Sequence, residues 1–294
     1  MRRFILFTFL KGVGLFFLYM PHCLRFNFAS FIAFLLFKFE KRRKSDLFAN
    51  LDFAYDGVLS EAKKQEIAKA NYLNVVYGVI GILILGVSSK EQVLKNIHFN
   101  QLDIVEDLLE KDAHIVFVTA HFGAWEYAAP AFACRFNRPI LVIARNIPYL
   151  LINEYLMHIR SRFNIQVLDK KGSLSSLIKA LRRDKVVGIV TDQNTSEKEG
   201  ELVNFFGKKV RHTPIASILS RKFDAKIIHA FTYYSKDYKK ILVDILPPIA
   251  HEKSENIHDD IYCLTQIQSE ILEKTVRESP EQWLWFHRKF KNQY

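Results

Sequence analysis

Cysteine is scarce in this chain, and its spacing excludes two common kinds of stabilising site. The three cysteines, Cys23, Cys134 and Cys263, lie far apart in 294 residues and form no CxxC pair. A disulfide framework or a structural zinc site needs more cysteines at closer spacing. We therefore expect neither of them, and we expect the body of the protein to lie in a reducing compartment.

Internal repeats and low-complexity linkers are also missing, which bounds the domain organisation. A chain of 294 residues is long enough to bury a full core, and an α/β fold of this length is commonly one compact unit. The sequence therefore predicts a hydrophobic membrane anchor at 1–44 and one further domain at 45–294.

Acidic residues are outnumbered, with 31 Asp and Glu against 42 Lys and Arg. A basic chain favours anionic partners: phospholipid headgroups, nucleic acid or an acidic carrier protein. Part of the surplus lies near the start, where residues 1–50 hold only Glu40 and Asp46 against nine basic residues: Arg2, Arg3, Lys11, Arg25, Lys38, Lys41, Arg42, Arg43 and Lys44. This placement beside apolar sequence indicates that the anionic partner is lipid and disfavours nucleic acid as a partner.

Two apolar runs occupy this N-terminal region. Residues 4–20 are almost continuously apolar apart from Lys11, at the lower edge of the length that spans a bilayer. Residues 26–39 form a shorter run that ends before the basic group at 41–44. Positive charge on both flanks of the second run predicts that the body stays on the cytoplasmic side of the membrane.

Two other interpretations of the N-terminus stay open. Arg2 and Arg3 resemble the charged start of a signal peptide, but no small-x-small cleavage site follows. The two apolar runs could also form an N-terminal helical hairpin that is buried in the protein, because such a hairpin needs equally apolar sequence. The apolar stretch 75–87 is too short to span and predicts a buried or membrane-dipping helix within a longer helix opened by Ser60.

From about residue 101, short apolar runs alternate with helical patterns. Such alternation predicts an α/β fold with a central mixed, largely parallel sheet flanked by helices. We expect early strands at 114–120, 139–145, 165–168 and 185–192. After residue 200 the pattern loosens, and we expect a loop at 201–210, a helix at 213–222, two β-like runs, and a helix across 257–278.

The stretch VFVTAHFGAWEYAAP, residues 116–130, places His121 directly after an apolar strand and Glu126 five residues later. Ligands of open α/β sheets bind at the carboxyl ends of strands. A regular helix would set these side chains about 140° apart, so we expect Gly123 to break the path and let Glu126 reach His121. A carboxylate that holds one ring nitrogen leaves the other nitrogen as a base. A structural His–Glu pair is the plainer alternative.

Several further motifs accompany HFGAWE. They are Arg145 at a strand end, Asp192-Gln193, NFFGKKVRHTP at 204–214, PEQWLWFHRKFK at 280–291 and the basic segment at 42–55. Together they resemble the lipid A biosynthesis (lauroyl/myristoyl-type) acyltransferases, a branch of the lysophospholipid acyltransferase superfamily that carries His-x4-Glu. The branch usually has Asn before the Trp-Glu pair, where this chain has Ala124.

The resemblance implies an O-acyltransferase of the bacterial inner membrane, with its active site facing the cytoplasm. It would move a fatty acyl chain from an acyl carrier protein thioester to a hydroxyl of a Kdo-lipid A type precursor, with His121 as base and Glu126 orienting it. It implies no metal or organic cofactor. The partners would be acyl carrier protein, the lipid A precursor and inner membrane lipids, with no nucleic acid.

Further site residues follow from the same resemblance. Arg145 and Arg160 would hold phosphate or the oxyanion, because guanidinium matches such oxygens, although surface positions are the alternative. Asp192 and Gln193 would order the site, unless Asp192 caps the next segment. The remaining candidates are Arg211 and Thr213 for an anionic headgroup, Phe122 and Trp125 for the acyl channel, and Trp283, Trp285, His287 and Arg288 for closing the fold.

Two functional alternatives stay open at this point. The chain could acylate a phospholipid or another glycolipid, or it could be a non-catalytic, membrane-anchored lipid-binding protein. In the second case a His121→Ala substitution would leave the phenotype unchanged.

Overall fold

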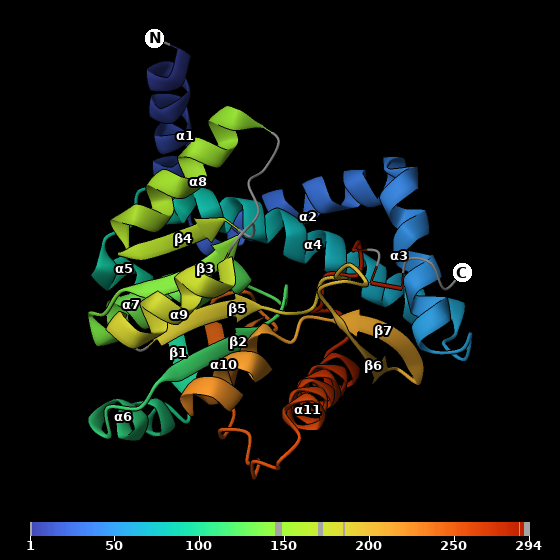
Figure 1. Cartoon of the computed structure of the whole chain (residues 1–294). Coiled ribbons are helices and arrows are strands. Elements are labelled where there is room, and N and C mark those ends of the chain that lie inside the picture. Colours follow the sequence, from blue (N-terminus) through green and yellow to red (C-terminus); the bar gives the residue numbers. More distant parts are fainter. Residues whose placement is uncertain (1, 145–148, 170–172, 185, 288, 291–294) are drawn as a thin grey trace.

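A computed structural model of the chain describes residues 2–144, 149–169, 173–184, 186–287 and 289–290. Arg145 and Arg288, two of the predicted site residues, lie outside these ranges. Figure 1 shows a twisted central sheet with helices packed on both of its faces and the N-terminal helices along one side.

The central sheet has seven strands in the order β1-β9-β8-β2-β5-β3-β4. Every neighbouring pair runs parallel except β8 and β9, which confirms the predicted mixed, largely parallel sheet. The strands are β1 (Ile97–Asn100), β2 (Ile115–Thr119), β3 (Ile140–Ala144), β4 (Ile165–Asp169), β5 (Val186–Val190), β8 (Lys226–Tyr234) and β9 (Ile241–Ile245). The first four residues of β2 are buried, as expected for a strand covered on both faces.

Alternate side chains of the strands pack on helices of opposite layers. Val116 and Val118 of β2 lie in one apolar cluster with helices α9 (Ser173–Asp184), α10 (Ile215–Phe223) and α11 (Ile257–Glu278). Ile115 and Phe117 lie in another with α4 (Glu61–Leu85) and α7 (Ala128–Phe136). This period of two follows from strand geometry and produces three layers. Helix α8 (Leu150–Arg162) packs beside α4 near β4, while α6 (Asp103–Glu110) and α5 (Lys90–Lys95) lie at the margin.

The segment expected as a loop at 201–210 is instead part of a β-hairpin, so that prediction is wrong. Strands β6 (Glu201–Phe205) and β7 (Lys208–His212) pair antiparallel. The turn residues Phe206 and Gly207 both have positive φ, 53° and 70°, which suits a two-residue hairpin turn. Phe205 and Phe206 are buried against α11 and the C-terminal segment, so the tertiary contacts stabilise a turn whose sequence signal is weak.

The predicted anchor folds as α1 (Arg2–Tyr19) and α2 (His22–Phe39), joined at Met20 and Pro21, and α3 (Lys41–Ala54) follows. Among the described residues, α2 and α4 are long and apolar enough to cross a membrane by length and composition, although a core helix or a signal sequence passes the same criterion. Helix α4 begins after Ser60, whose side chain accepts from the Lys63 amide at 3.2 Å, which confirms the predicted start. Residues 75–87, predicted as a buried or membrane-dipping helix, form its second half and the turn beyond it.

Candidate active site

The site forms where two neighbouring parallel strands end. Thr119 of β2 is paired in register with Val190 of β5, and the Thr191 amide donates to the Thr119 carbonyl at 3.0 Å. His121 and Asp192 come two residues beyond the ends of these strands. Their side chains meet, with 2.8 Å between His121 Nδ1 and Asp192 Oδ1.

Asp192 is a buried carboxylate with three donors. Besides the imidazole, the His121 backbone N–H donates to its Oδ2 at 3.0 Å and Trp283 Nε1 donates to the same oxygen at 2.9 Å. Its side chain is 4% exposed, whereas that of His121 is 21% exposed. Burial alone would raise the pKa of Asp192, but His121 and these hydrogen bonds hold it well below its usual range. Asp192 is therefore an anion in the folded protein.

The contact with Asp192 sets the state of the imidazole. An ionised carboxylate can only accept, so Nδ1 carries the hydrogen and Nε2 keeps its lone pair. Burial would lower the pKa of His121, yet the nearby Asp192 charge and hydrogen bond, with a further contribution from Glu126, raise it. Nε2 of His121 lies 3.4 Å from Nε2 of the Gln193 side-chain amide. The arrangement is that of a base with an orienting carboxylate.

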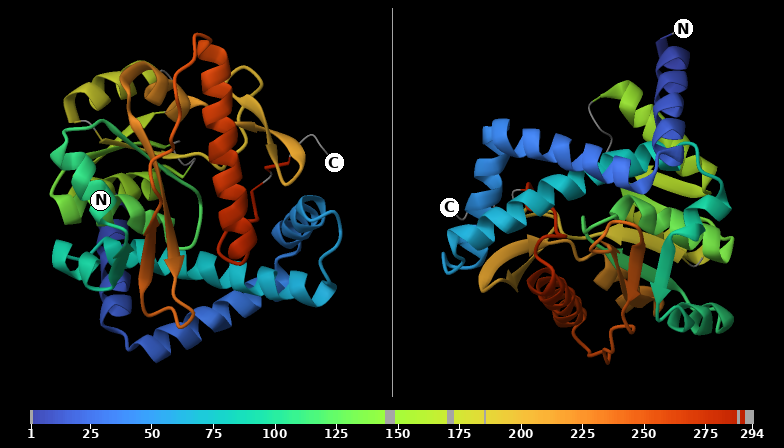
Figure 2. Two further views of the ribbon diagram at one scale, coloured as in Figure 1. Left: turned by 90° about the horizontal axis from the view of Figure 1, so that it is seen from below. Right: turned by 180° about the vertical axis from the view of Figure 1, so that it is seen from behind.

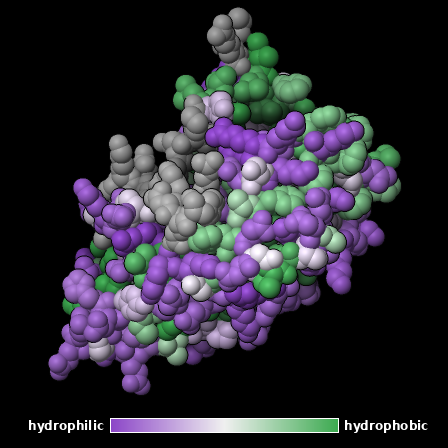
Figure 3. Space-filling view, turned by 90° about the vertical axis from the view of Figure 1, so that its right-hand side faces the viewer, coloured by the Kyte–Doolittle hydropathy of each residue, from purple (hydrophilic) through white to green (hydrophobic). Residues whose placement is uncertain are grey.

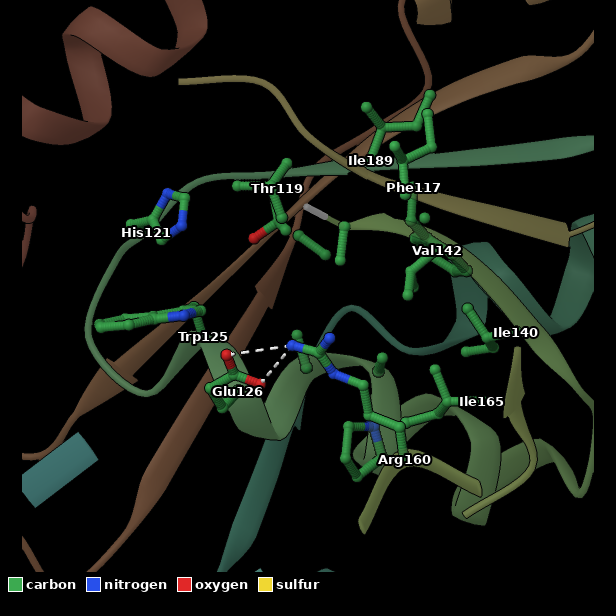
Figure 4. A pocket seen from close by; sticks show the side chains of 18 of the residues that line it. Phe117, Thr119, His121, Trp125, Glu126, Ile140, Val142, Arg160, Ile165 and Ile189 are labelled. Carbon is green, nitrogen blue, oxygen red and sulfur yellow. Dashed lines mark hydrogen bonds and ion pairs between the residues drawn. The ribbon is translucent and has the colours of Figure 1, made fainter. Parts of the chain in front are cut away.

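The carboxylate that bonds the His121 ring is Asp192, and not Glu126 as the sequence indicated. Gly123 does break the path, with φ of +50°, as predicted. A short 3-10 turn over Trp125–Tyr127 then carries Glu126 toward α8, where Arg160 Nη2 lies 3.4 and 3.3 Å from its two carboxylate oxygens. Among the described residues, the His121 ring therefore bonds Asp192 rather than Glu126. Figure 4 shows Glu126 facing Arg160, with Trp125 near the His121 side.

The C-terminal segment holds the loop that carries His121. The Gly123 amide donates to the Gln282 carbonyl at 2.8 Å, and the Leu284 amide donates to the His121 carbonyl at 2.9 Å. A Cβ at position 123 would collide with the Thr232 carbonyl and lie 2.9 Å from the Tyr233 Cα. Trp283 and Trp285 are both buried. These residues close the fold, and Trp283 also reaches Asp192.

An apolar cavity of about 390 Å³ extends from His121 between the sheet and the helices. Trp125 stands at the same end, with its ring 5.4 Å from the His121 ring in an edge-to-face arrangement. The labelled side chains at the other end in Figure 4 are mostly aliphatic and come from β2, β3, β4 and β5. The lining includes Leu85, Phe117, Phe132, Ile140, Val142, Leu156, Ile159, Ile165 and Ile189. Glu126, Arg160 and Gln193 supply polar groups at its wall.

Two predicted contacts do not occur at this cavity. Phe122 is fully buried and packs on Tyr233 and Phe231, with centroids 4.9 and 5.8 Å away, so it belongs to the core and not to the channel. Arg211 donates to the Gly200 carbonyl at 3.0 Å and is not among the lining residues. Thr213 does line the cavity.

Several polar residues near the site carry no recognisable sequence motif. Asn194 and Thr195 follow Gln193 and line the cavity, a placement that the strand end at Asp192 could have indicated. His212, His229 and Lys289 are buried. Burial lowers the pKa of His229 to about 3 and that of Lys289 to about 8, although the Asp192 charge opposes the second shift. Burial also lowers the pKa of His212 well below its usual range, so both His212 and His229 are neutral. No local pattern distinguishes them from ordinary core residues.

Comparison with known sequences identifies the family. A sequence model described as bacterial lipid A biosynthesis acyltransferase matches residues 1–292. The chain belongs to this family. The resemblance seen in the sequence motifs is thereby confirmed.

Characterised relatives of the family are distant in sequence. The chain is 24% identical over 283 residues to the lipid A biosynthesis lauroyltransferase of Escherichia coli K12, covering 95% of this chain and 90% of that protein. It is 18% identical over 232 residues to the myristoyltransferase of the same organism, covering 79% and 70%. A Haemophilus influenzae lipid A biosynthesis acyltransferase is 26% identical over 184 residues, covering 62% and 57%. Membership of this family supports an acyltransferase of lipid A biosynthesis.

Proposed function

We propose that this chain is a membrane-bound O-acyltransferase that transfers a fatty acyl chain from an acyl carrier protein thioester to a hydroxyl of a Kdo-lipid A type precursor. Transfer would take place at the cytoplasmic face of the bacterial inner membrane. The observation that carries the proposal is the His121–Asp192 pair at the head of an apolar cavity. A base with an orienting carboxylate can take the proton of the acceptor hydroxyl, and apolar walls can bind the fatty acyl chain.

His121 Nε2 takes the proton of the acceptor hydroxyl as its oxygen attacks the thioester carbonyl carbon. The new C–O bond forms, the C–S bond breaks, and the proton passes from Nε2 to the departing sulfur, which leaves as the carrier thiol. Asp192 accepts from Nδ1 throughout and stabilises the imidazolium. General base catalysis of this kind contributes about 10²–10⁴-fold to the rate.

The negative charge of the tetrahedral intermediate needs donors in the cavity. Arg160 is one candidate, because its guanidinium lies on the wall beside Glu126. Glu126 would hold Arg160 in position and add its charge to the field at His121. Gln193 would donate to the acceptor oxygen near Nε2. Arg145 stays a candidate for binding an anionic group of the acceptor. Asp192 and Trp125 would shape the site around the acceptor.

Membrane attachment is part of the proposal. Large apolar side chains of α1 and α2 are exposed, among them Phe4, Phe9, Phe31 and Phe39. The basic residues between 38 and 44 suit anionic headgroups. An acceptor that carries several acyl chains could then reach the protein without leaving the bilayer.

Lipid A mass spectrometry tests the proposed function. Cells that lack this gene should accumulate lipid A that is one acyl chain short, and the wild-type gene should restore the mass. A His121→Ala gene expressed at the same level should fail to restore it. Restoration by His121→Ala would exclude His121 as the base and favour a non-catalytic role. A mass change confined to phospholipids would instead show a phospholipid acceptor.

A further inference from the structure

One face of α2 carries a continuous stripe of exposed apolar side chains. Leu24, Phe28, Phe31 and Phe39 are 56%, 43%, 59% and 67% exposed, respectively. At 100° per residue these positions fall within about 80° of each other around the helix, so they point in one direction. Phe34 and Leu36, which are 57% and 39% exposed, flank this stripe on either side. Figure 3 shows apolar surface gathered over the upper part of the molecule and hydrophilic surface below it.

The opposite face of α2 is fixed to the body along its length. Ala29 and Ala33 are buried and point away from the stripe. Phe26 contacts the ring of Tyr77 near one end, at 6.3 Å, and Phe37 contacts that of Tyr72 near the other, at 5.8 Å. Both tyrosines belong to α4, which is itself bound to the C-terminal segment near the site. Helix α2 therefore moves with the catalytic body.

The tie between α4 and the C-terminal segment is polar and partly buried. Asn71 and Asn74 of α4 both donate to the Glu281 carbonyl, at 3.0 and 2.7 Å. The Trp285 amide donates back to the Asn71 side chain at 3.1 Å. Since Trp283 of the same segment holds Asp192, the orientation of α2 in a membrane also sets the orientation of the active site.

Exposed basic residues stand at both ends of α2. Lys38, Lys41, Arg42 and Arg43 lie at its C-terminal end. At its N-terminal end, Tyr238 in the turn between β8 and β9 packs on Phe26 at 5.7 Å. The same turn exposes Lys236, Lys239 and Lys240, and Lys239 pairs with the exposed Asp237 at 3.5 Å, so the turn keeps a positive surplus. Figure 2 shows the tip of this hairpin reaching α2.

This charge placement discriminates between two orientations. If α2 crossed a bilayer, one of the two basic groups would have to pass to the far side together with part of the folded body. Each charge that passes through the hydrocarbon centre costs about 2.5–3.5 kcal/mol there. If α2 lies parallel to the surface, both groups reach anionic headgroups and the stripe enters the acyl boundary. Each basic residue near such a surface contributes about 1 kcal/mol.

We propose that α2 lies in the plane of an anionic phospholipid bilayer, with the stripe Leu24, Phe28, Phe31 and Phe39 buried at the boundary between headgroups and acyl chains. The inference refines the membrane attachment of the proposed function and is independent of the acyl-transfer chemistry. It makes α2 an in-plane docking helix and orients the catalytic body toward lipid.

Spin-label depth measurements on the full chain test the proposal. Cys23, Cys134 and Cys263 are first replaced by Ser, and single cysteines are then placed at Leu24, Phe31 and Phe39. The protein is bound to vesicles of phosphatidylcholine and phosphatidylglycerol, and label depth is measured from collisions with oxygen and a water-soluble nickel chelate. In-plane α2 should give three similar depths. A spanning α2 should give depths that change by about 22 Å from Leu24 to Phe39, at 1.5 Å per residue.

Controls separate this inference from the wider proposal. A label at Tyr262, an exposed aromatic on α11, should stay accessible to the nickel chelate. Helix α11 packs on the opposite face of the sheet from α4, to which α2 is bound. Graded depths along α2 would overturn the in-plane orientation and leave membrane attachment intact. Failure to bind vesicles would overturn both. Dipolar coupling between labels, with neither reagent reaching them, would show that a second copy covers the stripe. Acyl transfer measured separately on detergent-dispersed substrate would report on the chemistry in every case.

Discussion

Asp192 is the residue on which the proposed chemistry depends after His121. It is buried, accepts three hydrogen bonds, and stabilises the tautomer that leaves Nε2 free to take a proton. Glu126 faces the same cavity but is paired with Arg160. The two carboxylates therefore have different roles, which substitution can separate.

Asp192→Asn should lower the rate of acyl transfer about 10²–10⁴-fold, because the amide no longer fixes the tautomer or stabilises the imidazolium. Since Asp192 raises the pKa of His121, the acid side of the pH profile of kcat/KM should also move to lower pH. Glu126→Gln should shift the profile less, because the charge of Glu126 contributes less than that of Asp192 to the raised pKa of His121. A pH–rate series on both variants checks this. A larger loss for Glu126→Gln, with an unshifted Asp192→Asn profile, would return the orienting role to Glu126.

The same pair should make folding stability depend on pH. The lowered pKa of Asp192 means that its stabilisation is present above its unfolded value, about 3.9, and is lost as pH falls through the folded value. The raised pKa of His121 means that its stabilisation is present below about 6.5 and is lost as pH rises through the folded value. The stability difference between wild type and Asp192→Asn should therefore be largest between about pH 4 and 6.5. Denaturant unfolding at several pH values measures it, and a difference independent of pH would contradict it.

At the scale of elements, the turn after β2 decides where His121 lies. Gly123 has a positive φ and sits against the backbone of β8, while Gln282 accepts from its amide. The 3-10 turn that follows sends Glu126 to α8. The sequence predicted the break at Gly123, because five residues of regular helix cannot bring His121 and Glu126 together. It could not predict the direction of Glu126, which Arg160 on a distant helix determines.

Gly123→Ala should lower the free energy of unfolding by more than the about 1–3 kcal/mol that a strained backbone conformation costs, because the new Cβ also collides with β8. Activity should fall as well, since the displaced turn carries His121. Gly57→Ala is the matched control: its φ is +69°, and a Cβ there meets nothing within 4 Å. Thermal unfolding of both variants compares them. Equal losses would show that the collision is relieved at no cost.

At the scale of the whole molecule, the N-terminal helices give the protein one apolar side with basic margins. Replacing Lys41, Arg42 and Arg43 by Gln should weaken binding to anionic vesicles by up to about 10²-fold, at about 1 kcal/mol for each charge. Neutral vesicles should show little change, and added salt should reduce the difference. Vesicle co-sedimentation measures the affinity.

The matched control replaces exposed lysines away from this margin. Lys222 and Lys226 lie on α10 and at the start of β8, at the opposite end of that strand from the turn beside α2. Changing both to Gln removes positive charge without touching the proposed surface, and binding should stay close to wild type. An equal loss for each removed charge would show that total charge, rather than its placement, governs the attachment.

Local pattern determined much of this protein from the sequence by itself: the alternating elements, the parallel strands, the capped start of α4, the apolar N-terminus and the placement of His121 at a strand end. These features depend on neighbours within a few residues. The pairing of His121 with Asp192 depends on strand order, because β5 lies between β2 and β3 although β3 comes first in the chain. A local sequence pattern cannot indicate a contact between residues 71 positions apart. Only the tertiary structure therefore decided which carboxylate bonds the His121 imidazole.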